Sequence, residues 1–180
     1  AVVLLVMAPV CLTGLDADSG FVAYGLHWRV NESLFRLVTV GVNTLLDALA
    51  WNSVEGYALT RVAVACLMIG WVGWQCRSVR ELPAEWWHRC LLIVAAVFLL
   101  SPAGFPWYFL WVVPFLVVQP SMPLLLLNCL LPLYYLVFFF RARHAGETFD
   151  AYIVWIEYLP VALAMLCQWL ARKPAQAGSR

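Results

Sequence analysis

Long apolar runs are the feature that most constrains how this chain can fold. Several runs approach the roughly 20 helical residues that cross a hydrocarbon core of about 30 Å, and the clearest cover residues 57–75, 122–140 and 149–171. Hydrophobic residues make up 64% of the 180 residues and charged residues only 12%, about half the charged share of a soluble domain. We therefore expect an all-α, polytopic transmembrane helical bundle with the lipid bilayer as its first partner.

Residues 31–51 follow a different pattern, in which polar residues recur every three or four positions. Apolar residues fill the other side of the helix that this spacing predicts. Such an amphipathic helix suits the plane of the membrane interface better than the lipid core. Asn31 precedes the helix and is the predicted N-cap residue.

The stretch "SPAGFP" at residues 101–106 interrupts two apolar runs with residues that break helices. Pro102 and Pro106 cannot donate backbone hydrogen bonds. Non-helical backbone at membrane depth persists only where protein or a water-filled cavity covers it. We therefore expect a Pro-broken or re-entrant segment beside a cavity near the outer face, with residues 90–119 forming either two spans or a re-entrant hairpin.

The aromatic residues after this break allow a simpler interpretation. Trp107, Tyr108 and Trp111 carry rings of the kind that gather at the headgroup level of membranes. The break would then be an ordinary interhelical turn in an interfacial aromatic belt.

Basic residues set the expected orientation in the membrane. Arg77, Arg80 and Arg89 lie in one loop, and the polar tail at 172–180 is also basic. Placing both on the cytoplasmic side puts the break and the segment 31–51 on the outer face.

The charge balance and the cysteines exclude several classes of function. A net charge of +1 argues against nucleic acid as a partner. The six cysteines form no CxxC pair, so their pattern indicates neither a zinc site nor a disulfide framework. Asp16 and Asp18 could hold a divalent cation, but two acids in a polar loop do not support that function, and we assign no metal and no cofactor.

The first residues, "AVVLLVMAPVCLTG", have no initiating Met and no basic flank, unlike a signal peptide. We interpret them as the last half of a helix. Residues 1–180 are therefore expected to be a single membrane domain, the C-terminal fragment of a longer chain.

Three stretches together resemble one family of membrane enzymes. They are "YGLHWRVNESLFRLV" (24–38), "LSPAGFPWYFLWVVPFL" (100–116), and the pair "LPLYYLVFFF" and "FDAYIVWIEYLPV" within 131–161. In this order they are similar to the back half of bacterial mannosyltransferase-like enzymes of the GT-C class, which use polyprenyl-phosphate sugars. Many members carry His immediately before Pro-Trp-Tyr, where this chain has Phe105, so the motif here lacks an imidazole that could transfer a proton or bind phosphate.

The resemblance implies transfer of a hexose, with mannose as the expected sugar, from a polyprenyl-phosphate donor to an unidentified glycan or lipid acceptor. The reaction would take place at the outer face of a bacterial inner membrane. In this family the essential acidic residue lies in the first outer loop, which we expect upstream of this chain, so no catalytic residue is assigned here.

Side chains near the expected outer face are the candidate substrate-binding residues. Trp107 and Tyr108 offer aromatic faces to a sugar ring or a polyprenyl chain. Arg61 is the only charged residue within its span, and it either binds the donor phosphate or extends to the interface. Glu157 is the only charge in the core of the last span, and it either binds acceptor hydroxyls or forms an ion pair with Arg61.

Two further groups complete the candidate site. His27, Trp28 and Asn31 would form part of the pocket wall, with the helix cap as the other role for Asn31. Arg141 and Arg143 are suited to binding the lipid phosphate, or they are ordinary basic residues that flank a span.

A non-enzymatic polytopic protein is the rival interpretation. Half of a transporter or flippase, or a scaffold subunit, could also bind a lipid-linked substrate. A scaffold would tolerate Ala at Trp107, Tyr108 and Arg61 without loss of function.

Overall fold

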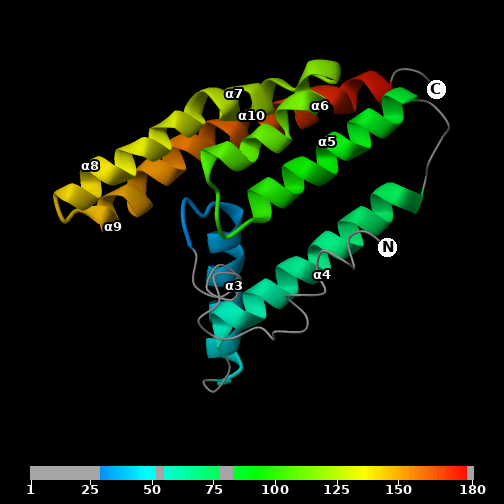
Figure 1. Ribbon diagram of the computed structural model, residues 1–180. Coiled ribbons are helices and arrows are strands. Elements are labelled where there is room, and N and C mark those ends of the chain that lie inside the picture. The colour runs from blue at the N-terminus through cyan, green and yellow to red at the C-terminus, as the bar shows by residue number, and fades with distance from the viewer. Residues whose placement is uncertain (1–28, 52–54, 78–82, 178–180) are drawn as a thin grey trace, which may run out of the picture. The chain divides into compact units, whose positions relative to one another are not determined.

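The computed structural model describes residues 29–51, 55–77 and 83–177. By its internal contacts the chain divides into two compact units, Ala1–Val30 and Asn31–Arg180, and nearly all described residues belong to the second. Helices joined by short connections make up this described part, which contains no β-strand (Figure 1). The expected all-α helical bundle is confirmed.

Three kinds of helix occur along this unit. The α-helices are α3 (Leu34–Ala48), α4 (Gly56–Arg77), α5 (Pro83–Leu100), α6 (Val113–Val118), α7 (Met122–Leu130), α8 (Leu136–Ala142), α9 (Gly146–Thr148) and α10 (Val154–Ala177). The other elements are the 3₁₀-helices η1 (Pro106–Trp111) and η2 (Leu131–Tyr135) and the π-helical turn η3 (Phe149–Ile153).

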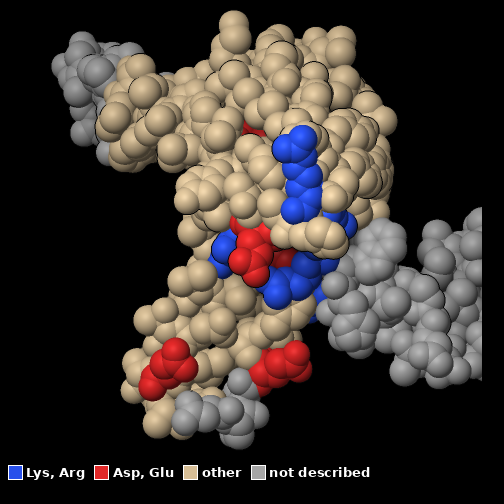
Figure 2. All heavy atoms as spheres, turned by 90° about the vertical axis from the view of Figure 1, so that its left-hand side faces the viewer, with Lys and Arg blue, Asp and Glu red and all other residues tan. Residues whose placement is uncertain are grey.

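Three helical segments of the described chain are long and apolar enough to cross a membrane: Gly56–Arg77, Met122–Ala142 and Gly146–Ala171. Many of their large apolar side chains are exposed instead of packed inside. Figure 2 shows a face on which charged side chains gather in small groups, with basic and acidic residues side by side, while most of the surface is uncharged. Such surfaces require lipid as their solvent, so the chain is an integral membrane protein.

The predicted Pro-broken segment is a helical hairpin. After α5 the chain turns through residues 101–105, and η1 and α6 then pack against α5. Near the turn, the rings of Phe98 and Phe109 meet edge to face at 5.1 Å between centroids. At the other end, the side-chain amide of Gln119 donates to the carbonyl oxygen of Ala84 at 3.3 Å. The return leg therefore reaches back to the first turn of α5.

Local residues explain the turn at 101–105. The hydroxyl of Ser101 accepts a hydrogen bond from the backbone N–H of Ala103 at 3.1 Å, which is a turn that serine favours. Phe105 is extended (φ −67°, ψ 137°), as the residue before a proline must be. Pro106 then begins η1 at a position where its missing N–H removes no helical hydrogen bond.

A second proline shapes the apolar segment from α7 to α8. Pro132 lacks a backbone N–H, and the chain passes through the tighter turn η2 before α8 continues. α10 packs along α7 (Figure 1). Leu127 on α7 and Val154 and Val161 on α10 are among the buried core residues. α10 extends to Ala177, into the predicted polar tail.

α3 is the predicted amphipathic helix, but the predicted N-cap is wrong. The helix begins at Leu34, and Asn31 lies before it with a φ of 54°. The buried side-chain amide of Asn31 does not cap α3, because it donates hydrogen bonds to Gly104 and Glu157, which lie far away in the sequence. On α3, Phe35 is buried while Leu37 and Leu45 are exposed, which leaves apolar surface that suits a membrane interface.

The packing of α7 yields a stability prediction. Leu127→Ala should lower the free energy of unfolding by about 2 kcal/mol or more, because removing a fully buried leucine side chain leaves a cavity. Leu125→Ala is the matched control, because this side chain on the same helix is 37% exposed. Reversible unfolding in detergent measures both variants, and equal destabilisation by the two would contradict the burial of Leu127.

Candidate functional site

A polar cluster, defined here as Asn31, Gly104 and Glu157, joins three distant parts of the chain. The side-chain amide of Asn31 donates to the carboxylate oxygen Oε2 of Glu157 at 2.8 Å and to the carbonyl oxygen of Gly104 at 3.3 Å. The partners lie 126 and 73 positions away in the sequence. The cluster therefore ties the segment before α3 to the hairpin turn and to α10.

The backbone around the cluster is closely fitted. Asn31 has the left-handed φ that asparagine tolerates better than most residues. A Cβ atom at Gly104 would lie 2.8 Å from the backbone oxygen of Asn31 and 3.2 Å from the hydroxyl of Tyr158. Only glycine leaves room for this approach, so the position of Asn31 depends on Gly104.

Two acceptor oxygens of the cluster have no donor among residues 29–51, 55–77 and 83–177. Asn31 is 3% exposed and Glu157 has no exposed surface. Within the part of the chain that the structure describes, Oδ1 of Asn31 and Oε1 of Glu157 are buried and accept no hydrogen bond. Buried polar atoms are satisfied in the great majority of proteins. A hydroxyl group or a water molecule that donates to these oxygens would complete the site.

An aromatic cluster adjoins Gly104 and consists of Phe105, Trp107, Tyr108, Trp111 and Tyr134. Phe105 stacks on Trp107 at 4.4 Å with 13° between the planes, and Tyr108 stacks on Trp111 at 5.2 Å with 22°. Tyr134 meets the rings of Phe105 and Trp107 edge to face. Trp107 remains 45% exposed. Stacked rings with free faces can bind the C–H surface of a sugar or an isoprenoid chain.

Phe105 occupies the position where the resembled family often has histidine. Its ring is buried among the other aromatic residues of the cluster. A phenyl ring carries no exchangeable proton and no donor for phosphate. Its role here is packing.

The alternative in which Glu157 pairs with Arg61 is wrong. The guanidinium of Arg61 donates to the hydroxyl of Tyr57 at 3.2 Å and lies 4.6 Å from the centroid of that ring. Glu157 is hydrogen-bonded by Asn31. Asn31 is therefore the partner of Glu157, and Tyr57, one turn before Arg61 on α4, is the partner of Arg61.

The remaining predicted residues fall into two groups. Arg141 and Arg143 are exposed near the end of α8, and the guanidinium of Arg143 lies 4.3 Å from the ring centroid of Phe139. This places basic groups beside aromatic surface on that element. His27 and Trp28 lie outside the described residues, as do Asp16 and Asp18 of the cation hypothesis.

Sequence reasoning missed two contributors to the site. The sequence marks Gly104 as one of the residues that break the helix, but a glycine between two prolines is also a signal for close backbone approach. Tyr158 follows Glu157 on α10, and its hydroxyl comes close to Gly104. No pattern in the sequence predicts which helix that hydroxyl faces.

Comparisons with known proteins add no information about the function of this site. No protein-family model matches the chain, and no curated protein or solved structure matches it either. The relation to GT-C enzymes therefore stays a prediction from the three sequence stretches.

Substitution of Gly104 tests the close fit of the polar cluster. Gly104→Ala should lower the unfolding temperature, because the added methyl group would overlap the backbone oxygen of Asn31. Gly73→Ala is the matched control, because nothing lies within 4 Å of a Cβ there and alanine is the better helix former by about 0.5–1 kcal/mol. Thermal unfolding in detergent measures both, and a stable Gly104→Ala protein would contradict the contact.

Proposed function

We propose that this chain is the donor-binding part of a GT-C class membrane glycosyltransferase. It would transfer a hexose, with mannose as the expected sugar, from a polyprenyl-phosphate donor at the outer face of a bacterial inner membrane, as a multi-pass protein. One observation carries the proposal: each of the three stretches that resemble the family contributes one residue to the polar cluster, namely Asn31, Gly104 and Glu157.

The aromatic cluster supports a sugar and lipid substrate. The exposed indole of Trp107 lies on the buried ring of Phe105, so its orientation is held before any ligand arrives. Preorganised rings bind with a smaller entropic cost than mobile ones. The ring of Tyr108 is held in the same way against Trp111.

The polar and basic groups support the other parts of such a substrate. Among the described residues, Oδ1 of Asn31 and Oε1 of Glu157 are acceptors without a donor, and sugar or acceptor hydroxyls are donors. The exposed guanidinium groups of Arg141 and Arg143 are suited to a phosphate diester or monoester. Because the family places its catalytic acid elsewhere, Glu157 is proposed as a binding residue.

Substitution of Trp107 tests the sugar site. In membranes that contain the full natural chain, Trp107→Ala should lower hexosyl transfer from a polyprenyl-phosphate donor at least about tenfold, the equivalent of about 1.4 kcal/mol of lost binding. Trp86→Ala is the matched control, because Trp86 is similarly exposed but lies in the first turn of α5. Transfer that survives Trp107→Ala unchanged would exclude the sugar role and would fit a scaffold.

Substitution of Glu157 tests the hydroxyl-binding role. Glu157→Gln keeps the size of the side chain and an acceptor for Asn31 but removes the charge, so we expect transfer to be lost while the protein stays folded. Glu147→Gln, at an exposed position on α9, should change neither. Normal transfer by Glu157→Gln would show that the carboxylate does not act on substrate, and unfolding of this variant would assign Glu157 a structural role.

A transporter or flippase half is the second candidate function. The observation in its favour is the broken helical segment from α5 to η1. The Asn31 amide links its turn to the buried carboxylate of Glu157, because it donates to both the carbonyl oxygen of Gly104 and the carboxylate. Secondary transporters place interrupted helices at their binding sites. Movement of a lipid-linked sugar across proteoliposomes, without hexosyl transfer, would favour this function over the enzyme.

A further inference from the structure

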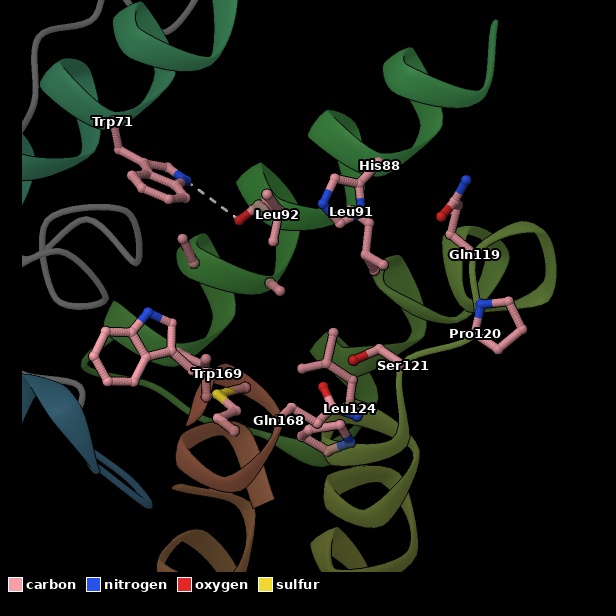
Figure 3. Close-up of a pocket in the computed structure, with 15 residues that line it drawn as sticks. Trp71, His88, Leu91, Leu92, Gln119, Pro120, Ser121, Leu124, Gln168 and Trp169 are labelled. Atoms are coloured by element: carbon pink, nitrogen blue, oxygen red, sulfur yellow. Dashed lines mark hydrogen bonds between the residues drawn. The ribbon is translucent and has the colours of Figure 1, made fainter. Parts of the chain in front are cut away.

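A cavity of about 480 Å³, whose lining includes no residue of the polar cluster, lies between α4, α5, the connection from α6 to α7, the start of α7, and α10. Figure 3 shows the indoles of Trp71 and Trp169 on one side of this space and Gln119, Pro120 and Ser121 on the other. Its walls are mainly apolar. We call this space the chamber.

A second hollow adjoins the chamber at the first turns of α5. The two share His88, Leu92 and Gln119 as lining residues, and the second also touches Glu85 and Arg89. We call this second hollow the mouth. Both hollows are lined mainly by apolar surface, and the mouth differs from the chamber in that the charged residues Glu85 and Arg89 line it.

The mouth is lined by one carboxylate, Glu85, one guanidinium, Arg89, and the imidazole of His88. The carboxylate of Glu85 and the guanidinium of Arg89 lie 4.0 Å apart, and Arg89 also donates to the carbonyl oxygen of Gln75. Oε2 of Glu85 is buried and, among the described residues, accepts no hydrogen bond. The mouth therefore offers a negative and a positive group within one helical turn.

Lipid is the occupant that this combination fits. Hollows of this size with mainly apolar walls and a few polar groups are typical sites for ligands. The walls belong partly to α4 and α10, which are apolar enough to cross a membrane, so acyl chains surround the cavity. A single positive or negative headgroup would leave one of Glu85 and Arg89 facing a like charge. A zwitterionic headgroup matches both.

We propose that the chamber and its mouth bind one zwitterionic phospholipid, with an acyl chain in the chamber, its ammonium group at Glu85 and its phosphate at Arg89. This site is separate from the polar and aromatic clusters. The proposal for this site does not depend on the proposed transferase activity, because its test measures bound lipid.

The test is native mass spectrometry of the purified chain after reconstitution with equal amounts of phosphatidylethanolamine, phosphatidylcholine and phosphatidylglycerol. We expect one retained lipid per chain, with the two zwitterionic lipids favoured over phosphatidylglycerol by about fivefold or more. Equal retention of all three, or no retained lipid, would overturn the proposal and leave only the surrounding annular lipid.

Two variants locate the bound lipid. Ala96→Phe fills the chamber, which Ala96 lines, and should lower lipid retention about fivefold or more. Val97→Phe is the matched control, because the neighbouring side chain is exposed on the outer surface. Unchanged retention by a folded Ala96→Phe variant would overturn the proposal.

Substitution at the mouth gives an independent result if Ala96→Phe fails to fold. Glu85→Gln removes the partner of the ammonium group but leaves Arg89 for phosphate. The preference should therefore shift toward phosphatidylglycerol, with total lipid retention preserved. A preference that Glu85→Gln does not change would overturn the assignment of the headgroup.

Discussion

The two hydrogen bonds of the Asn31 amide are the interaction on which the rest of this structure depends. Non-helical backbone at membrane depth persists only where protein or a water-filled cavity covers it, so the carbonyl oxygen of Gly104 needs a donor. Asn31 supplies that donor and binds the carboxylate of Glu157 with its other N–H. A buried polar group without its partner costs about 1–3 kcal/mol. One side chain thereby stabilises the hairpin turn and holds it against α10.

The turn held in this way also determines what the protein presents to a ligand. Two prolines end α5 and start η1, and the chain folds back with its aromatic residues at the bend. Phe105 is buried next to Gly104, and Trp107 stacks on it while remaining 45% exposed. The same residues that interrupt the helix therefore position the rings that we propose for sugar and lipid binding.

The two ends of α5 carry different chemistry for a physical reason. At its C-terminal end the break creates backbone groups that need polar partners, and the polar cluster forms there. At its N-terminal end the charged residues Glu85 and Arg89 lie at the border of an apolar chamber. The first arrangement suits hydroxyl-rich ligands, and the second suits an amphipathic lipid.

The sequence by itself determined the apolar helices, the break after residue 100 and the isolated charge of Glu157 within the last span, because hydropathy, proline chemistry and a single intramembrane charge are local signals. Only the tertiary structure decided the partners. The local sequence favours Asn31 as a helix cap, yet its side chain donates to Glu157 on α10. Arg61 and Glu157 carry opposite charges, yet Arg61 donates to Tyr57 and Glu157 accepts from Asn31. A hydrogen bond between residues more than 100 positions apart, such as Asn31 and Glu157, depends on how the helices pack. Sequence periodicity predicts single helices, and it does not predict which helices pack together.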